Sequence, residues 1–102
     1  MDNPPFENSY YMSAEAPKLL IKLIQKSPLA NKILCYFFTI FDENNKVVCS
    51  ITDIEIELTE KTSKIKKALD VLIEMNFIEV EDLENSDIKI FIVNPDIARS
   101  KL

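Results

Sequence analysis

The sequence contains no glycine and no histidine in 102 residues. Histidine is the commonest general base and transition-metal ligand, so its absence argues against most hydrolytic and metal-dependent sites. Without glycine, neither a glycine-rich phosphate loop nor a nucleophile elbow of the usual kind can form. The sequence therefore predicts a protein that is not an enzyme and that binds no cofactor or metal ion.

Cysteine is also scarce, and apolar runs are short. Cys35 and Cys49 have neither metal-binding nor redox spacing and stand among apolar residues, so we expect two buried free thiols and a reducing compartment. The first residues lack the basic region of a secretory signal, and no apolar run approaches the roughly 20 residues of a membrane span. These features predict a cytoplasmic protein without a membrane segment.

The absence of glycine also bears on the turns. Backbone positions with positive φ fall to asparagine or aspartate when glycine is missing. Asn44, Asn45, Asn76 and Asn85 stand where turns are expected. We therefore expect these asparagines to adopt positive φ.

Positive and negative charges are separated along the chain. The net charge is -5 and the isoelectric point is near 4.7, which argues against a simple nucleic-acid-binding protein. However, every charge from Lys61 to Lys67 is positive, and every charge from Asp70 to Asp87 is negative. Contacts to phosphate are local, because salt screens charges beyond about 8–10 Å. We therefore expect one basic face on an otherwise acidic molecule.

The length and the 47% hydrophobic content fit a single domain with a real core. Pro4 and Pro5 forbid an early helix, so residues 1–12 are predicted to form an N-terminal arm and residues 13–102 the domain. An amphipathic helix is expected from residue 13 or 14 to about 25, with Pro17 in its first turn. One side of this helix carries a lysine stripe, which is either a solvated face or a second phosphate contact: Lys18, Lys22 and Lys26.

The next predicted helix runs from Pro28 to about Phe41, with Ser27 as its cap. It is apolar nearly all round, so it needs cover on both sides, either from the preceding helix or from a second subunit. We expect a homodimer formed through this region, with four interface residues: Leu20, Ile24, Leu34 and Phe38.

The segment Ile51–Leu58, which follows a predicted turn at 42–45 and a short strand at 47–50, is ambiguous. Its residues 54–58 alternate between apolar and acidic, as in a half-buried strand. Against that, Thr52 and Glu55 have the spacing of a capping box, and Ile54 and Leu58 share one helical face. We favour a helix, because the turn and helix that follow need a helical partner here.

From Leu58 to Val80 the pattern indicates a turn, a helix of about three to four turns and the start of a strand. Asn76 ends the helix. Strands at 77–81 and 88–93 then form a hairpin with its tip at 82–87, and a last short turn is expected from 96 to 101. A lysine-bearing helix after a tight turn, leading into a hairpin, is the layout of a winged helix-turn-helix DNA-binding protein.

The lysine-bearing helix is the predicted DNA-binding element. Its outward face is basic in the first two turns and acidic afterwards, as needed by a helix that enters the major groove with its N-terminal end. Lys61, Lys64, Lys66 and Lys67 would neutralise phosphates, while Thr62 and Ser63 would touch base edges or phosphate. The hairpin is acidic, and its plausible contacts are Asn85, Ser86 and Lys89. The alternative is an ordinary solvated lysine cluster.

The run Leu58, Ile65, Ala68-Leu69, Leu72, Asn76 and Phe77-Ile78 resembles the winged helix-turn-helix family across turn, recognition helix and first wing strand. Thr59 stands where the family usually has the turn glycine, and Glu60 where an apolar residue is usual. The resemblance implies an α+β fold, a helical core with a C-terminal β-hairpin wing, and binding to double-stranded DNA.

Residues 27–34 and 93–97 resemble segments of RepL-type plasmid replication initiators, and the overall pattern is similar to TcpK-type accessory proteins of conjugative-plasmid relaxosomes. This resemblance implies a homodimer at an origin of transfer, acting beside a relaxase or another plasmid-transfer protein. A replication initiator or transcriptional repressor of the same fold is an alternative. A winged helix that binds only protein is the second alternative, favoured by the acidic hairpin and the net charge.

Overall fold

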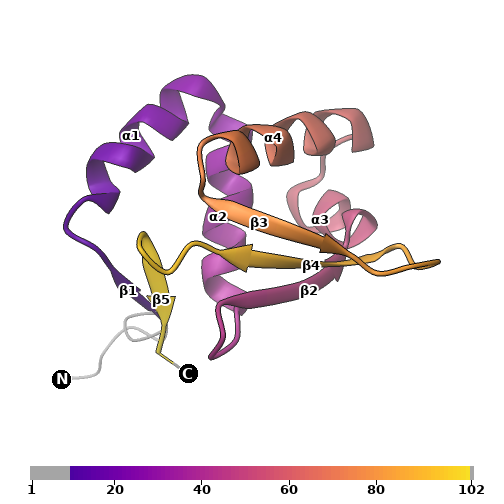
Figure 1. Cartoon of the computed structure of the whole chain (residues 1–102). Helices are drawn as coiled ribbons and strands as arrows, with labels where there is room; N and C mark the ends of the chain where they lie inside the picture. The colour runs from indigo at the N-terminus through magenta and orange to yellow at the C-terminus, as the bar shows by residue number, and fades with distance from the viewer. Residues whose placement is uncertain (1–9, 102) are drawn as a thin grey trace, which may run out of the picture.

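The computed structural model describes residues 10–101 and contains two consecutive pairs of helices and two small antiparallel sheets (Figure 1). The elements in chain order are β1 (Tyr10–Met12), α1 (Ala16–Lys26), α2 (Pro28–Ile40), β2 (Lys46–Ser50), α3 (Ile51–Leu58), α4 (Thr62–Glu74), β3 (Ile78–Asp82), β4 (Ile88–Val93) and β5 (Ala98–Ser100).

The three-stranded sheet has the order β2-β4-β3, so that β4 is central and the hairpin β3–β4 forms a wing. Helices α3 and α4 are joined by a tight turn and pack on each other, and α4 also packs on α2. Figure 1 shows α2 behind the sheet and α4 along one edge of it. The predicted α+β winged helix-turn-helix fold is confirmed.

Side-chain caps fix where the helices begin. The hydroxyl of Ser27 accepts a hydrogen bond from the Ala30 N–H at 3.0 Å, as predicted for the start of α2. The helix expected at 51–58 is also present, but its predicted capping box is wrong. Ser50 and Asp53 make the reciprocal bonds, at 2.9 and 3.0 Å. Thr52 therefore lies within the first turn of α3 and does not cap it.

Positive φ angles occur at three of the expected asparagines: Asn45, Asn76 and Asn85. Asn44 does not adopt one. Its N–H instead donates to the Asp42 carboxylate at 2.8 Å, in a local turn. Thr59, at the end of α3, has φ of 53° and was not expected to. A β-branched residue is rarely found in this region, so the turn between α3 and α4 holds local strain.

Replacing Thr59 by glycine should raise the free energy of unfolding by about 1 kcal/mol, because glycine has no Cβ to oppose the left-handed conformation. Urea denaturation would measure the change. Thr59→Ala is the matched control and should alter stability little, since alanine keeps the Cβ. A Thr59→Gly variant less stable than the parent protein would show that the turn is not strained.

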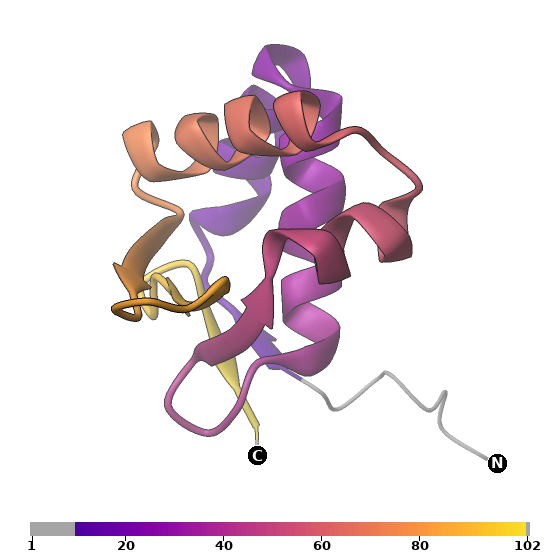
Figure 2. The same cartoon turned by 90° about the vertical axis from the view of Figure 1, so that its right-hand side faces the viewer.

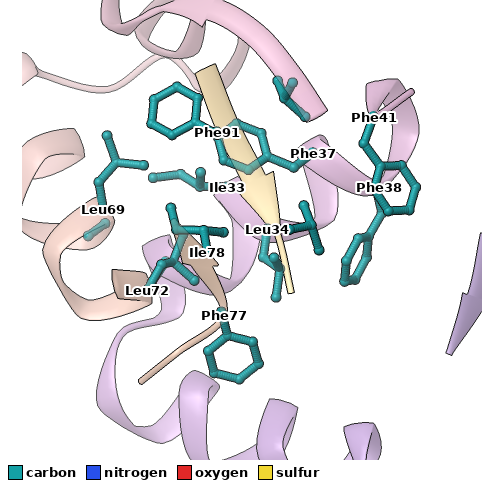
Figure 3. Close-up of a cluster of buried hydrophobic side chains, with 14 of the residues drawn as sticks. Ile33, Leu34, Phe37, Phe38, Phe41, Leu69, Leu72, Phe77, Ile78 and Phe91 are labelled. Atoms are coloured by element: carbon teal, nitrogen blue, oxygen red, sulfur yellow. The ribbon is translucent and has the colours of Figure 1, made fainter. Parts of the chain in front are cut away.

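Helix α2 forms the centre of the hydrophobic core (Figure 3). The ring of Phe37 lies 4.9 Å from that of Phe91 on β4 and is fully buried. On another side of α2, Phe38 stacks on Tyr10 of β1 at 4.8 Å. The cover that the apolar helix needs therefore comes from its own chain.

This packing corrects the predicted dimer interface. Leu34 is fully buried and Phe38 is 3% exposed, so neither side chain is available to a second subunit. Leu20 is half-buried against the core, and only Ile24, at 48% exposed, faces solvent freely. The prediction is wrong for Leu34 and Phe38 because α4 and β1, as well as the preceding helix α1, pack on α2.

The ends of the described chain pair with each other. Strand β1 pairs antiparallel with β5, with Tyr11 opposite Arg99. The turn expected at 96–101 is therefore wrong in part, since residues 98–100 form a strand. Of the predicted N-terminal arm, residues 1–9 lie outside the described residues, and residues 10–12 form β1.

The two cysteines occupy different environments. Cys49 on β2 is buried, as predicted, and burial together with nearby Asp53 raises the pKa of its thiol to about 11. Cys35 on α2 is exposed, so the prediction of a buried thiol is wrong there. The apolar neighbours of Cys35 in sequence point to the core, while Cys35 itself lies on the other side of the helix.

Candidate nucleic-acid interface

The N-terminal half of α4 gathers the predicted contact residues on one exposed surface. Four apolar side chains of this helix are buried, which fixes its orientation: Ile65, Ala68, Leu69 and Leu72. The remaining positions of its first two turns face solvent. The structure thus places six predicted residues together, which we call the α4 basic surface: Lys61, Thr62, Ser63, Lys64, Lys66 and Lys67.

The lysines of this surface are largely unneutralised. In residues 10–101, Lys61, Lys66 and Lys67 form no ion pair with any carboxylate. The ammonium of Lys64 lies 4.0 Å from the carboxylate of Glu60, and its side chain is 63% exposed. An exposed pair of this kind contributes little stability and gives way readily to a stronger anion. Four ammonium groups are therefore available to phosphates.

The helix terminus adds to the positive potential of this surface. The N-terminal end of a helix carries a partial positive charge, which favours acidic residues in the first turn. In α4 the first turn contains no acidic residue, and the N-cap residue Lys61 makes no side-chain capping bond. This arrangement costs stability, but it directs unpaired N–H groups and cations toward the same place, where an anion would bind well.

Replacing Lys61 by serine should therefore raise the free energy of unfolding by about 1 kcal/mol, because serine can cap α4. The same change should weaken binding to duplex DNA several-fold, since one cation is lost. Lys61→Ala is the matched control, with the same loss of charge and no new cap. Thermal unfolding and a duplex titration measure the two effects. A Lys61→Ser variant that binds as tightly as the parent protein would exclude Lys61 from the interface.

The two hydroxyl side chains of this surface differ in their availability. The hydroxyl of Thr62 donates to a carboxylate oxygen of Glu55 on α3 at 2.8 Å, which links the two helices of the helix-turn-helix. Ser63 is exposed, and its hydroxyl has no hydrogen-bond partner within the described part of the chain. Ser63 is therefore the more available of the two for a base edge or a phosphate.

The tip of the wing carries the other predicted contacts. Asn85 is exposed at positive φ, and the hydroxyl of Ser86 accepts a hydrogen bond from the Ile88 N–H at 3.0 Å. The ammonium of Lys89 pairs with the carboxylate of Asp82 across the hairpin. The tip thus offers two polar side chains, while its cation is already engaged and its remaining charges are acidic.

A groove joins α4 to the wing. Figure 2 shows α3, α4 and the hairpin tip on the side of the molecule that faces the viewer. The groove between them is lined by residues of all three elements: Ile51, Thr52, Glu55, Thr62, Lys66, Ser86, Asp87 and Lys89. Four of the nine predicted DNA contacts therefore share one groove, and Lys61, Ser63, Lys64, Lys67 and Asn85 lie outside its lining.

Thr52 and Glu55 belong to this site but were not predicted to. The sequence predicts a capping box at these two residues, whereas the actual box lies two residues earlier, at Ser50 and Asp53. The sequence Ser50-Ile51-Thr52-Asp53 also has capping-box spacing, so this signal was present. With the cap made elsewhere, Thr52 is exposed in the groove and Glu55 is free to hold Thr62.

Within residues 10–101, no group of three acidic or cysteine side chains is arranged to hold a metal ion. No helix among these residues has the length and apolar character needed to cross a bilayer. The chain matches no protein-family model and no curated protein.

Proposed function

We propose that this protein binds double-stranded DNA through the α4 basic surface and supplies no catalytic group. The observation that carries the proposal is the clustering of four exposed lysines at the positive end of one helix, in a chain whose net charge is -5. The helix dipole and the repulsion between the lysines both make such a cluster unfavourable for folding, so a contribution to stability does not explain its presence. Binding to phosphates does explain it.

In this proposal the N-terminal end of α4 enters the major groove. Its lysines contact phosphates on either side, and Ser63 lies closest to the base edges. Asp70 and Glu74 stand two and three turns further along the same helix, away from the duplex. Asn85 and Ser86 would contact the backbone beside the groove, whereas the acidic side chains of the wing limit how closely it can approach DNA.

The biological role is proposed from the resemblance described above. The protein would act as a cytoplasmic homodimer at the origin of transfer of a conjugative plasmid, together with a relaxase or another transfer protein. Replication initiation or transcriptional repression would use the same surface on a different DNA site. A role in protein binding alone is the remaining candidate, supported by the acidic wing.

Footprinting on duplexes that carry a plasmid origin of transfer, a replication origin or a promoter would test this role. Protection is expected on one face of the duplex, in patches about 10 base pairs apart if two subunits bind adjacent half-sites. The fragment that is protected at the lowest protein concentration identifies the role. Absence of protection on all duplexes would favour the protein-binding alternative.

A further inference from the structure

One face of the three-stranded sheet is apolar and is left uncovered by helices in the described part of the chain. Phe91 and Val93 of β4 point into the core and are fully buried. The alternate residues of the same strand, Ile88, Ile90 and Ile92, lie on the opposite face. An antiparallel sheet with one solvated face normally carries polar residues there, whereas a strand that is apolar on both faces is typical of a sheet covered on both sides.

No described helix provides this cover. Figure 1 shows the three strands in front of α2, with no helix in front of them. On this face, Ile88 is 43% exposed and Val48 of β2 is 61% exposed, while Ile90 and Ile92 are half-buried. We call this set of four side chains the outer sheet face.

Charges of opposite sign flank the outer sheet face. The register aligns Lys46 on β2 with Ile92 on β4, and Ile92 with Glu79 on β3. In the next row on the same face, Val48, Ile90 and Glu81 are aligned. The apolar stripe on the central strand therefore has a lysine along one side and two glutamates along the other.

We infer that two copies of this chain associate through their outer sheet faces, around a twofold axis that runs along β4. This rotation leaves the position of each residue along the strand direction unchanged but exchanges the two edges of the sheet. As a result, β2 of one copy faces β3 of the other. Lys46 then lies opposite Glu79 of the second copy, and Ile90 and Ile92 pack against their own equivalents. Sheets pack about 10 Å apart, which the two charged side chains can span together.

Other charges also border the outer sheet face. Glu43 and Arg99 border the Ile92 end, in a shallow pocket beside the turn before β2. They carry opposite signs, so they leave the balance between the two sides of the stripe unchanged. Glu81 lies opposite Val48 of the second copy, at the edge of the interface, and has no cation opposite it. The row that contains Lys46 and Glu79 is therefore the self-complementary part of the face, and self-complementarity is the requirement for a twofold interface.

The size of the face sets the expected strength of association. Five residues on each of three strands cover about 17 by 14 Å. This is smaller than the standard interface, which buries about 800 Å² per partner. The footprint is roughly 240 Å², less than a third of that area, so we expect a weak, reversible dimer that forms at about 100 µM protein.

The arrangement deepens the homodimer part of the proposed function. Because positions along the direction of β4 are unchanged by the rotation, both wing tips and both α4 N-termini lie at the same end of the dimer. Two adjacent half-sites on one duplex could then be bound together. The association itself requires no DNA. A protein that does not dimerise through this face would therefore leave the proposal that α4 binds DNA unaffected.

Sedimentation of charge variants without DNA tests the interface. Lys46→Glu places two glutamates opposite each other, and Glu79→Lys places two lysines opposite each other, so each variant alone should associate at least about tenfold more weakly. In an equimolar mixture of the two variants, each contact again joins a glutamate of one copy to a lysine of the other, and association should return. Lys22→Glu on α1 is the matched control for Lys46→Glu and should associate like the parent protein.

A mixture that stays monomeric, while the parent protein dimerises, would overturn the inference, because it would place the interface elsewhere. A parent protein that is still monomeric at about 1 mM, well above the expected range of association, would also overturn it. Both substituted side chains are on the sheet surface, and circular dichroism would verify that each variant is folded. A purely intramolecular role of Lys46 or Glu79 would not be rescued by mixing.

Discussion

Replacing Lys64 and Lys67 together by glutamate should lower the affinity for duplex DNA at least about 100-fold at 0.1 M salt. Each lysine is expected to make one charge-assisted contact with a phosphate, and a glutamate in its place adds repulsion. Together these changes amount to about 3 kcal/mol. Both side chains are exposed on α4, so the free energy of unfolding should change little. Fluorescence anisotropy with a labelled duplex would measure the affinity.

The matched control replaces Lys18 and Lys22, two exposed lysines of α1, by glutamate. Both double variants change the net charge from -5 to -9, so a difference between them reports position and not total charge. An equal loss in both would mean either that the lysine stripe of α1 is a second phosphate contact or that binding depends only on overall charge. Retained binding in the α4 variant, with loss on substitution of Asn85 or Lys89, would instead make the wing the main contact.

Replacing Asn45 by alanine should lower the free energy of unfolding by about 3 kcal/mol or more. Asn45 directly precedes β2, and its polar side chain is only 6% exposed. It lies against the end of β4 and against strand β5. Its amide donates to the carbonyls of Val93 and Ala98 at 3.1 and 2.7 Å, and its oxygen accepts from the Ser100 N–H at 3.0 Å. Alanine would remove all three of these hydrogen bonds and would also have to adopt positive φ.

Asn45→Gly separates these two causes. Glycine loses the same three hydrogen bonds but tolerates the φ of 62°. It should therefore be about 1 kcal/mol less destabilised than Asn45→Ala. Urea denaturation of the two variants gives both values. If Asn45→Ala stayed within about 1 kcal/mol of the parent protein, water would have to replace the lost bonds, and Asn45 would not be the link between β2 and β5.

The elements predicted correctly are those whose signals are local. The apolar spacing of α4, the serine cap of α2 and the asparagines at turns can each be read within a few residues of sequence. Strand β5 was missed because it has three residues and its partner β1 lies almost a whole chain length away. Thr59 was missed because its left-handed conformation is imposed by the packing of α3 on α4, against its own preference.

In the candidate site too, the features with local sequence signals were predicted correctly, and the contacts between different elements were not. The exposure of the four lysines follows from the helical period, and it was predicted correctly. The bonds that alter the roles of Thr62 and Lys89 could not be predicted, because their partners, Glu55 and Asp82, come from neighbouring elements. The outer sheet face was likewise hidden, since only the pairing of three strands brings Lys46 and Glu79 into one row.

The salt dependence of binding tests the central claim most directly. A titration of labelled duplex with the parent protein, repeated at several salt concentrations, gives the slope of log affinity against log salt. Four lysine–phosphate contacts predict a slope of about -3.6 per subunit, and about twice that for a dimer on two half-sites. A slope near zero, or no binding to duplex at low salt, would contradict the account.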